Sequence, residues 1–329
     1  MGVYEIMKQR MEERRRMGTP QGTSPLFPSS YSAVPSAAGR AQGPILAQMD
    51  VPDTAGDFWM VDLPIVKGLM DAVCQSPHVQ GNVKYRALVD NLQFKLLERS
   101  LDRPAELGGP IDAAVVNAYA RMDALVDCFP TICIHAGAIR YSRLMAAAYV
   151  ASRYYADARP FPQAVVSMVS MFLRNGMRLT SELAAVYASE NGLMRIMRGQ
   201  ESFVEAHAIA CGTIIGILAH EFGHLALGHC SGMCLSDEVS RNREREADSF
   251  ASSVVSLSEY RNVIGIGTII WELALTVWQK VCRATATTHP LSAERLVDFI
   301  RANPSTAREI GFDQIRELLA TAGIILPEE

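Results

Sequence analysis

The alternation of apolar and polar positions along most of this chain has the period of α-helices. Apolar residues recur every three or four positions over residues 64–75 and 83–101, and from about residue 139 onward nearly the whole chain follows this spacing. A buried helix is predicted for 263–281, whose apolar run carries Glu272 at its centre, where a membrane span would not carry a charge. Breaks between the later helices fall at the turn-forming sequences 159–162, 175–176, 191–192 and 303–304.

Two short segments have the pattern of strands instead. Residues 111–119 and 131–135 are apolar and short, and Pro130 opens the second of them. We expect these segments to pair in a small antiparallel sheet. The fold class predicted from the whole pattern is therefore α+β and mostly α-helical.

The N-terminal region differs from the rest in composition. Residues 2–16 can form a short helix that ends in three arginines, and residues 17–46 are rich in Pro, Ser, Gly and Ala without any hydrophobic period. We therefore expect a flexible tail over residues 1–46 and a folded domain over residues 47–329.

The strongest chemical signal is the sequence HEFGH at residues 220–224, inside an apolar helical run. Two histidines four positions apart lie on one side of a helix, so His220 and His224 can reach the same metal ion. Glu221 is rotated away from that line and is placed to act as a general base on water. The preceding segment, 203–219, leads into this site and is expected to be a core helix. The pattern predicts a zinc site, with one Zn²⁺ per chain.

A third ligand is predicted about 20 residues further on. Glu244 and Asp248 lie one helical turn apart, beside an apolar stripe that would pack their helix into the core. Glu244 would complete a His₂Glu site, and Asp248 would accept a hydrogen bond from one ligand imidazole. Glu246 is rotated away from Glu244 and should face solvent. His229 follows Gly228, which can end the helix, and it is expected not to bind the zinc but to support a ligand from behind or to lie at the surface.

Composition sets limits on partners and location. The chain has 31 basic and 35 acidic residues, a net charge of −4, so no global charge favours nucleic acid or an anionic membrane surface. Its seven cysteines are scattered, and its first residues do not resemble a signal peptide. These observations predict a cytoplasmic protein.

The two metal-binding segments resemble those of zinc metallopeptidases of the gluzincin type. The strand around residues 116–120, the apolar segment 132–139, and the Thr-His-Pro sequence ending at Pro290, followed by Arg295, are similar to motifs of the M48 peptidases (the Ste24 and HtpX group). This resemblance covers about residues 112–300, taken as the catalytic core of a zincin-like domain with two metal-binding helices. It implies a place for His289, and for Arg295, near the oxyanion of the reaction.

A second resemblance follows from the short distance between the motif and Glu244. The spacing and the sequence EREADSFA at residues 244–251 are similar to the ImmA/IrrE (M78-like) regulatory peptidases, which cut helix-turn-helix repressors. The related peptidases of anti-phage operons, and the phage-exclusion peptidases that cut an elongation factor, are similar soluble enzymes. These resemblances imply a soluble zinc endopeptidase that performs limited, regulatory proteolysis, with a small repressor of a stress or antiviral defence response as one expected substrate.

Three alternatives stay open. The chain could be an M48-like quality-control peptidase associated with a membrane, a catalytically silent zinc-binding sensor scaffold, or a non-peptidase metal hydrolase. An intact Glu221 argues against the scaffold. A cysteine switch is a further hypothesis: Cys133, in the expected edge strand, could occupy the open zinc position through its thiolate. A second zinc at Cys230 and Cys234 would need two further ligands, which the sequence does not identify.

Overall fold

The computed structural model describes most of the chain beyond the N-terminal tail. The predicted tail over residues 1–46 lies outside the described residues. The described residues are 63–97, 118–122, 129–175, 178–196, 200–230, 236–258, 260–281 and 292–304, with single positions at 306, 308, 316 and 320.

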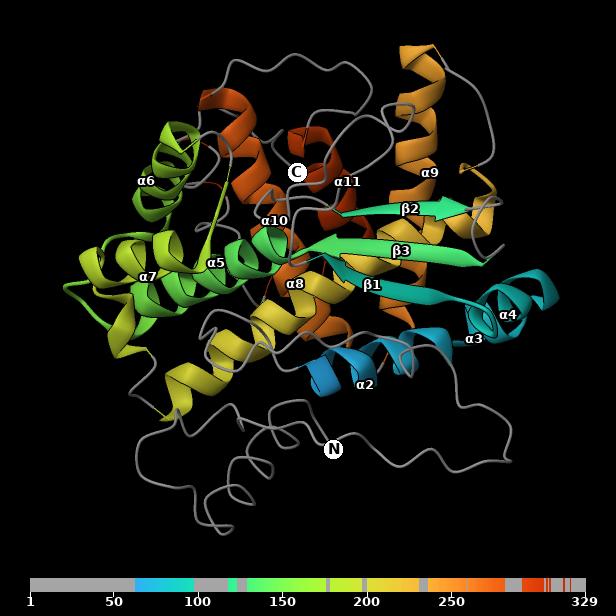
Figure 1. Cartoon of the computed structure of the whole chain (residues 1–329), viewed down its shortest axis with the longest axis horizontal. Helices are drawn as coiled ribbons and strands as arrows, with labels where there is room; N and C mark the ends of the chain where they lie inside the picture. The colour runs from blue at the N-terminus through green and yellow to red at the C-terminus, as the bar shows by residue number, and fades with distance from the viewer. Residues whose placement is uncertain are drawn as a thin grey trace, which may run out of the picture.

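Helix α8 (Gln200–Leu227) is the central element of the fold. It packs against α10 (Arg261–Val281), α9 (Asp237–Ser256), α5 (Ala136–Tyr154) and α2 (Leu63–Cys74). Figure 1 shows α8 crossing the middle of the molecule beside the sheet. Because helices surround it, α8 is apolar on all sides, as expected for a buried helix.

The apolar character of α8 also gives it the length and hydropathy of a membrane span. Among the described residues one helix, over Glu201–Leu227, meets both criteria, and 83% of its most apolar window is buried inside the protein. This burial confirms that the segment before the metal motif is a core helix. The interior of α10 is buried as well, which confirms the buried helix predicted for residues 263–281.

Glycines allow α8 and α10 to approach closely. A Cβ atom on Gly212 of α8 would lie 2.3 Å from the carbonyl oxygen of Val263, and one on Gly267 of α10 would lie 2.3 Å from the backbone nitrogen of Thr213. The Thr213 hydroxyl donates to the Gly267 carbonyl at 3.1 Å across this contact. Side chains of α10 that follow Gly267 are thereby held near the second half of α8, where the motif lies.

The sheet has three strands in the order β1-β3-β2. Strand β3 (Pro130–His135) pairs antiparallel with β2 (Ala118–Met122) and parallel with β1 (Gln93–Leu97). The expected antiparallel pair is present between β2 and β3, but the sheet as a whole is mixed, so the prediction of an antiparallel sheet is wrong. The parallel strand lies in the segment 83–101 that was predicted as one helix.

The physical reason is visible in the sequence of that segment. Helix α4 (Val83–Val89) ends before Asp90 and Asn91, residue types that favour turns. Phe94 and Leu96 then alternate with polar residues, and Phe94 is buried while Leu96 packs against the core. A period of two over so few residues is easily absorbed into a helical pattern.

The remaining helices complete the mostly α-helical architecture. Short helix α3 (Pro77–Gln80) follows α2, and helices α6 (Phe161–Arg174) and α7 (Ser181–Glu190) follow α5. The 3₁₀ turn η2 (Leu193–Arg195) precedes α8, and α11 (Ser292–Ala302) packs against α9 and α10. The ends of α6, α7 and α11 confirm the predicted breaks near residues 175, 191 and 303.

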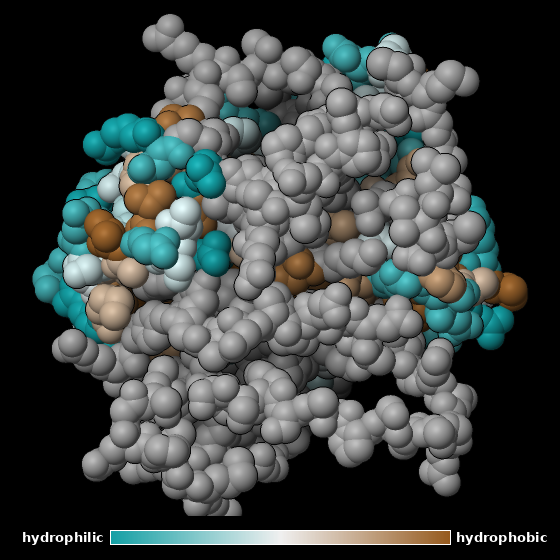
Figure 2. Space-filling model, viewed as in Figure 1, coloured by the Kyte–Doolittle hydropathy of each residue, from teal (hydrophilic) through white to brown (hydrophobic). Residues whose placement is uncertain are grey.

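The described surface intermixes hydrophilic and apolar side chains, as Figure 2 shows at the end formed by α6 and α7. Exposed large apolar residues such as Val83, Val186 and Val239 come from α4, α7 and α9, three different elements. They do not define one apolar docking face among the described residues.

Candidate active site

Helices α8 and α9 bring three potential metal ligands to one point. His220 and His224 project from successive turns of α8, and their Nε2 atoms lie 3.1 Å apart. Glu244 of α9 places Oε2 3.3 Å from His220 Nε2 and Oε1 3.4 Å from His224 Nε2. One ligand atom from each residue lies within 4.8 Å of the others, so the three residues could hold one metal ion.

Gly223 permits this convergence. A Cβ atom at this position would lie 3.0 Å from the carbonyl oxygen and 3.2 Å from the Cα atom of Ala247. The glycine in the middle of the motif therefore lets the backbone of α9 approach α8 closely. Ala247 is fully buried, and Glu244, one turn earlier, is 8% exposed.

The electrostatics of the three residues favour a positive charge. Burial alone would lower the pKa of His220, but hydrogen bonds and charges from Asp248 and Glu244 outweigh it and raise the pKa to about 10. The carboxylates of Asp248 and Glu244 thus favour a positive charge at the point where the two imidazoles meet. Buried carboxylates that stabilise a proton also suit a divalent cation, so the donor set and its field both fit a metal such as Zn²⁺.

Asp248 anchors His220 from behind. Its Oδ1 lies 2.8 Å from His220 Nδ1, so the hydrogen bond expected between Asp248 and a candidate ligand imidazole is present. Arg295 of α11 forms a two-bond ion pair with the same carboxylate, with Nε to Oδ2 at 2.8 Å and Nη2 to Oδ1 at 2.7 Å. Burial opposes ionisation, but Arg295 and His220 hold the pKa of Asp248 well below its usual range.

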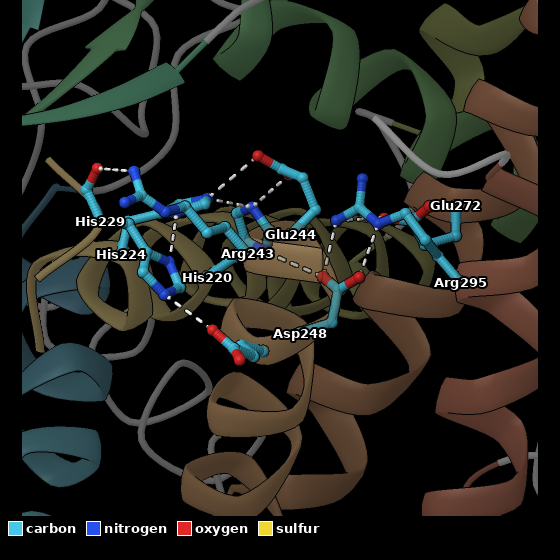
Figure 3. A network of polar contacts seen from close by, with 9 residues as sticks. His220, His224, His229, Arg243, Glu244, Asp248, Glu272 and Arg295 are labelled. Carbon is cyan, nitrogen blue, oxygen red and sulfur yellow. Dashed lines mark hydrogen bonds and ion pairs between the residues drawn. The ribbon is translucent and has the colours of Figure 1, made fainter. Parts of the chain in front are cut away.

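The polar network continues from Arg295 to Glu272 of α10. Contacts can be followed in Figure 3 from His229 through His224, His220 and Asp248 to Arg295 and Glu272. The oxyanion role that the M48 resemblance implied for Arg295 stays a prediction. The contacts show instead that this guanidinium orients Asp248.

Glu272 carries a buried carboxyl group, and one of its two oxygens contacts Arg295. Its Oε1 lies 3.4 Å from Arg295 Nη2, whereas Oε2 is buried and has no hydrogen-bond partner among the described residues. Burial raises the pKa of Glu272 to about 7, against the attraction of Arg295 and with the repulsion of Asp248 and Glu244. Glu272 therefore keeps its proton at pH values where an exposed glutamate has lost it.

We expect Glu272 to destabilise the metal-free protein as the pH rises from about 4.5 to about 7. In this window the unfolded chain has released the proton that the folded chain retains, so the free energy of unfolding falls with pH. The shift corresponds to roughly 3 kcal/mol across the window. Urea denaturation at several pH values should show a smaller fall for Glu272→Gln than for the wild type. Equal slopes for the two proteins would contradict this assignment.

The three potential metal ligands and the polar network around them line a cleft of about 1030 Å³. Glu221 lies in its wall beside the two histidines, and Ala118 and Ala120 of the outer strand β2 border it. Trp271, Leu275 and Trp278 of α10 also line it. The cleft thus combines a candidate metal site, a strand edge and a largely apolar wall.

Two predicted site residues are not confirmed by this arrangement, for different reasons. His289 lies outside the described residues, so its catalytic role stays a prediction. Cys133 was expected in an edge strand, and this is wrong, because β3 is the central strand of the described sheet. Cys133 is buried in that strand and is not among the residues that line the cleft. Cys230 is the described cysteine that does line it.

The sequence model of the Peptidase U49 family matches residues 182–312. The matched region runs from α7 into the chain beyond α11 and includes His220, His224 and Glu244. The match supports a proteolytic function in general, and it does not support the resemblances to the M48 and ImmA/IrrE peptidases. Comparison with curated proteins and with solved structures gives no match.

Two features of the site could not be assigned from the sequence. Glu272 was noted as a charge that argues against a membrane span, and no function was given to it. For His229 the sequence left open a supporting role or a surface position, and the structure puts its Nδ1 3.1 Å from His224 Nδ1. The signal for Glu272 was its position inside an apolar helix, since a buried acid needs a partner.

Proposed function

We propose that the protein is a zinc-dependent endopeptidase whose metal is held by His220, His224 and Glu244. The observation that carries the proposal is the convergence of two imidazole nitrogens and one carboxylate in a cleft that also contains Glu221. The match to a peptidase family over the same helices supports the proteolytic part of the proposal. When bound, Zn²⁺ would supply Lewis acidity and would lower the pKa of a water to about 7.

Three residues of the chain would carry the proton transfer and the positioning of the ligand. Glu221 accepts the proton of the attacking water and then delivers it to the leaving amine, the role of a general base followed by a general acid. Asp248 accepts a hydrogen bond from the Nδ1–H of His220, which leaves Nε2 free as the ligand atom. Arg295 holds Asp248 in the orientation required for this bond.

Strand β2 supports a binding mode for an extended peptide. Ala118 and Ala120, two positions apart, border the cleft, and β2 packs against α8, which carries the motif. In the described sheet β2 pairs on one side only, with β3. A substrate segment could add to its other side by β-augmentation, which would place a peptide bond near Glu221.

The biological setting is part of the proposal. We infer a cytoplasmic enzyme that cuts a small number of protein targets, for which a helix-turn-helix repressor of a stress or phage-defence response is the first candidate. A membrane-associated quality-control peptidase and a silent zinc-binding scaffold are the competing functions. No observation of the described residues favours either competitor over the enzyme.

The test is cleavage of native and denatured bacterial lysates by the full-length protein loaded with zinc. New peptide termini are mapped by mass spectrometry, with and without a zinc chelator, and again after zinc is restored. We expect a small set of new termini that disappears with the chelator and returns with zinc. Zinc binding without any new terminus would favour the scaffold instead.

We expect Asp248→Asn to act in two ways. It weakens the support of His220, which should lower zinc affinity or activity roughly 10–100-fold. It also leaves the guanidinium of Arg295 with Glu272 as its remaining carboxylate partner, which should lower the unfolding free energy of the metal-free protein by roughly 1–3 kcal/mol. Zinc titration and urea denaturation measure the two effects separately.

The double variant Asp248→Asn, Arg295→Met provides the control for that pair. Removing the cation that has lost Asp248 should restore part of the stability but none of the zinc affinity. Asp248→Asn with wild-type stability would show that the ion pair contributes nothing. Recovery of zinc affinity in the double variant would contradict the role of Asp248 toward His220.

A further inference from the structure

We propose that His229 and Glu246 form a second positioning arm, which fixes the imidazole of His224 as Asp248 fixes that of His220. The inference rests on the proposed zinc site and extends it to the other histidine. His224 Nδ1 lies 3.1 Å from His229 Nδ1, and His229 Nε2 lies 3.0 Å from Glu246 Oε2.

The positions of the protons follow from the metal-facing atoms. If Nε2 of His224 is the ligand atom, its ring proton is on Nδ1 and is donated to His229. His229 Nδ1 must then be an acceptor, so the neutral His229 ring carries its proton on Nε2. That N–H points at Glu246 Oε2, which accepts it. Every hydrogen bond of the arm thus has one donor and one acceptor.

The end of helix α8 places His229 in this arm. Gly228 has φ +76°, the left-handed conformation that glycine adopts readily, and it ends the helix after Leu227. The chain turns back, and the His229 backbone N–H donates to the carbonyl of His224 at 2.8 Å. The imidazole of His229 is thereby placed beside that of His224, five residues earlier.

Helix α9 closes the arm. Arg243 donates from Nη1 to the His229 carbonyl at 2.9 Å, and Glu246, three residues later on the same side of α9, accepts from the His229 ring. Glu244 and Asp248 lie on the adjacent side and serve the metal site and His220. One helix therefore supplies the third candidate ligand and both supports.

The two arms differ in their surroundings. The His220 arm ends in the ion pair of Asp248 and Arg295, whose side chains are 28% and 15% exposed, whereas the His224 arm ends on Glu246, whose side chain is 63% exposed. His229 itself is well shielded, with 8% of its side chain exposed. We therefore assign most of the positioning to His229 and a smaller share to Glu246, which acts through it.

The test is the zinc affinity of the full-length chain, measured by competition with a chromophoric chelator. His229→Phe keeps a ring but removes the acceptor, and we expect a loss of affinity of about 10–100-fold. His229→Asn presents its Oδ1 close to the position of the lost Nδ1 and should recover most of that loss. Glu246→Ala should lower affinity less than tenfold, and Glu238→Ala, at an exposed carboxylate of the same helix, should not lower it.

Double variants separate a connected arm from independent effects. Glu246→Ala should add nothing in the His229→Phe background, whereas Asp248→Asn should multiply the loss, because it supports the other histidine. The absorption spectrum of bound Co²⁺ should change in His229→Phe and return toward the wild type in His229→Asn. Thermal unfolding of the metal-free variants shows whether each one folds.

Specific outcomes overturn the proposal. The proposal fails if His229→Phe binds zinc with wild-type affinity, or if His229→Phe and His229→Asn lose zinc affinity equally. It also fails if the losses of affinity in His229→Phe and Glu246→Ala are fully additive in the double variant. If His229→Phe does not fold, the loss of zinc affinity caused by Glu246→Ala is measured in the wild type and in the His229→Asn background. Equal losses in these two backgrounds would overturn the proposal. If the wild type itself binds no zinc, the proposed function fails, and this inference fails with it.

Discussion

Glu221→Gln should reduce cleavage of any genuine substrate by about 10²–10⁴-fold while the zinc content stays near that of the wild type. Glutamine keeps the size of the side chain and removes only its ability to accept a proton. Because Glu221 is not among the three converging ligand atoms, its loss should leave the metal site intact. The measurement is the rate at which new termini form, with zinc content determined by mass spectrometry on the same samples.

The matched control is Glu201→Gln, at the exposed start of the same helix. It changes the same residue type far from the motif and should leave cleavage unchanged. Full activity in Glu221→Gln would remove Glu221 from the mechanism. Loss of zinc in that variant, to the same extent as in a ligand variant, would show that Glu221 holds the metal.

Much of the pairing of α8 with α9 could be predicted because both helices obey local periodicity. The spacing of His220 and His224 places them on one side of a helix, and the apolar stripe of α9 determines which of its acids turns inward. Glu244 is buried and Glu246 is exposed, as that stripe requires. The single residue Gly223 then sets how closely the helices approach, a distance that no periodicity encodes.

The contacts of Asp248 show where sequence reasoning stops. Its bond to His220 connects two predicted helices, but its ion pair reaches Arg295, 47 residues further on. Long-range ion pairs leave no periodic signal, and they depend on how α10 and α11 pack around the site. Glu272 was visible as an acid in an apolar helix, and only the packing of α11 shows which cation it meets.

The error in the sheet had a similar cause. Strand β1 is short and pairs with β3 at a separation of 38 residues, from Gln93 to Thr131. Without β1, β3 was expected at an edge of the sheet, where the Cys133 thiolate could have reached the zinc position. Once β1 is present, β3 is central and Cys133 is buried between its neighbours. One missed strand thus changed the interpretation of a site residue.

Glu244→Gln should lower zinc affinity by more than the roughly 10–100-fold expected for loss of a supporting residue. It replaces the anionic side chain of a proposed ligand by a neutral amide at a buried position, where the Glu244 oxygens lie 3.3 Å and 3.4 Å from the two Nε2 atoms. Zinc at 100 times its dissociation constant should stabilise the wild type by about 2.7 kcal/mol. The same zinc concentration should stabilise Glu244→Gln far less.

Thermal unfolding with and without zinc measures this difference directly, and Glu238→Gln, at an exposed acid in the first turn of α9, is the control. The control should keep the full zinc-dependent rise in melting temperature. Equal rises in Glu244→Gln and the wild type would exclude Glu244 from the metal site, and one of the remaining acids of the cleft would have to complete it. Loss of the rise together with loss of cleavage would instead connect the metal, the three ligands and proteolysis in one site.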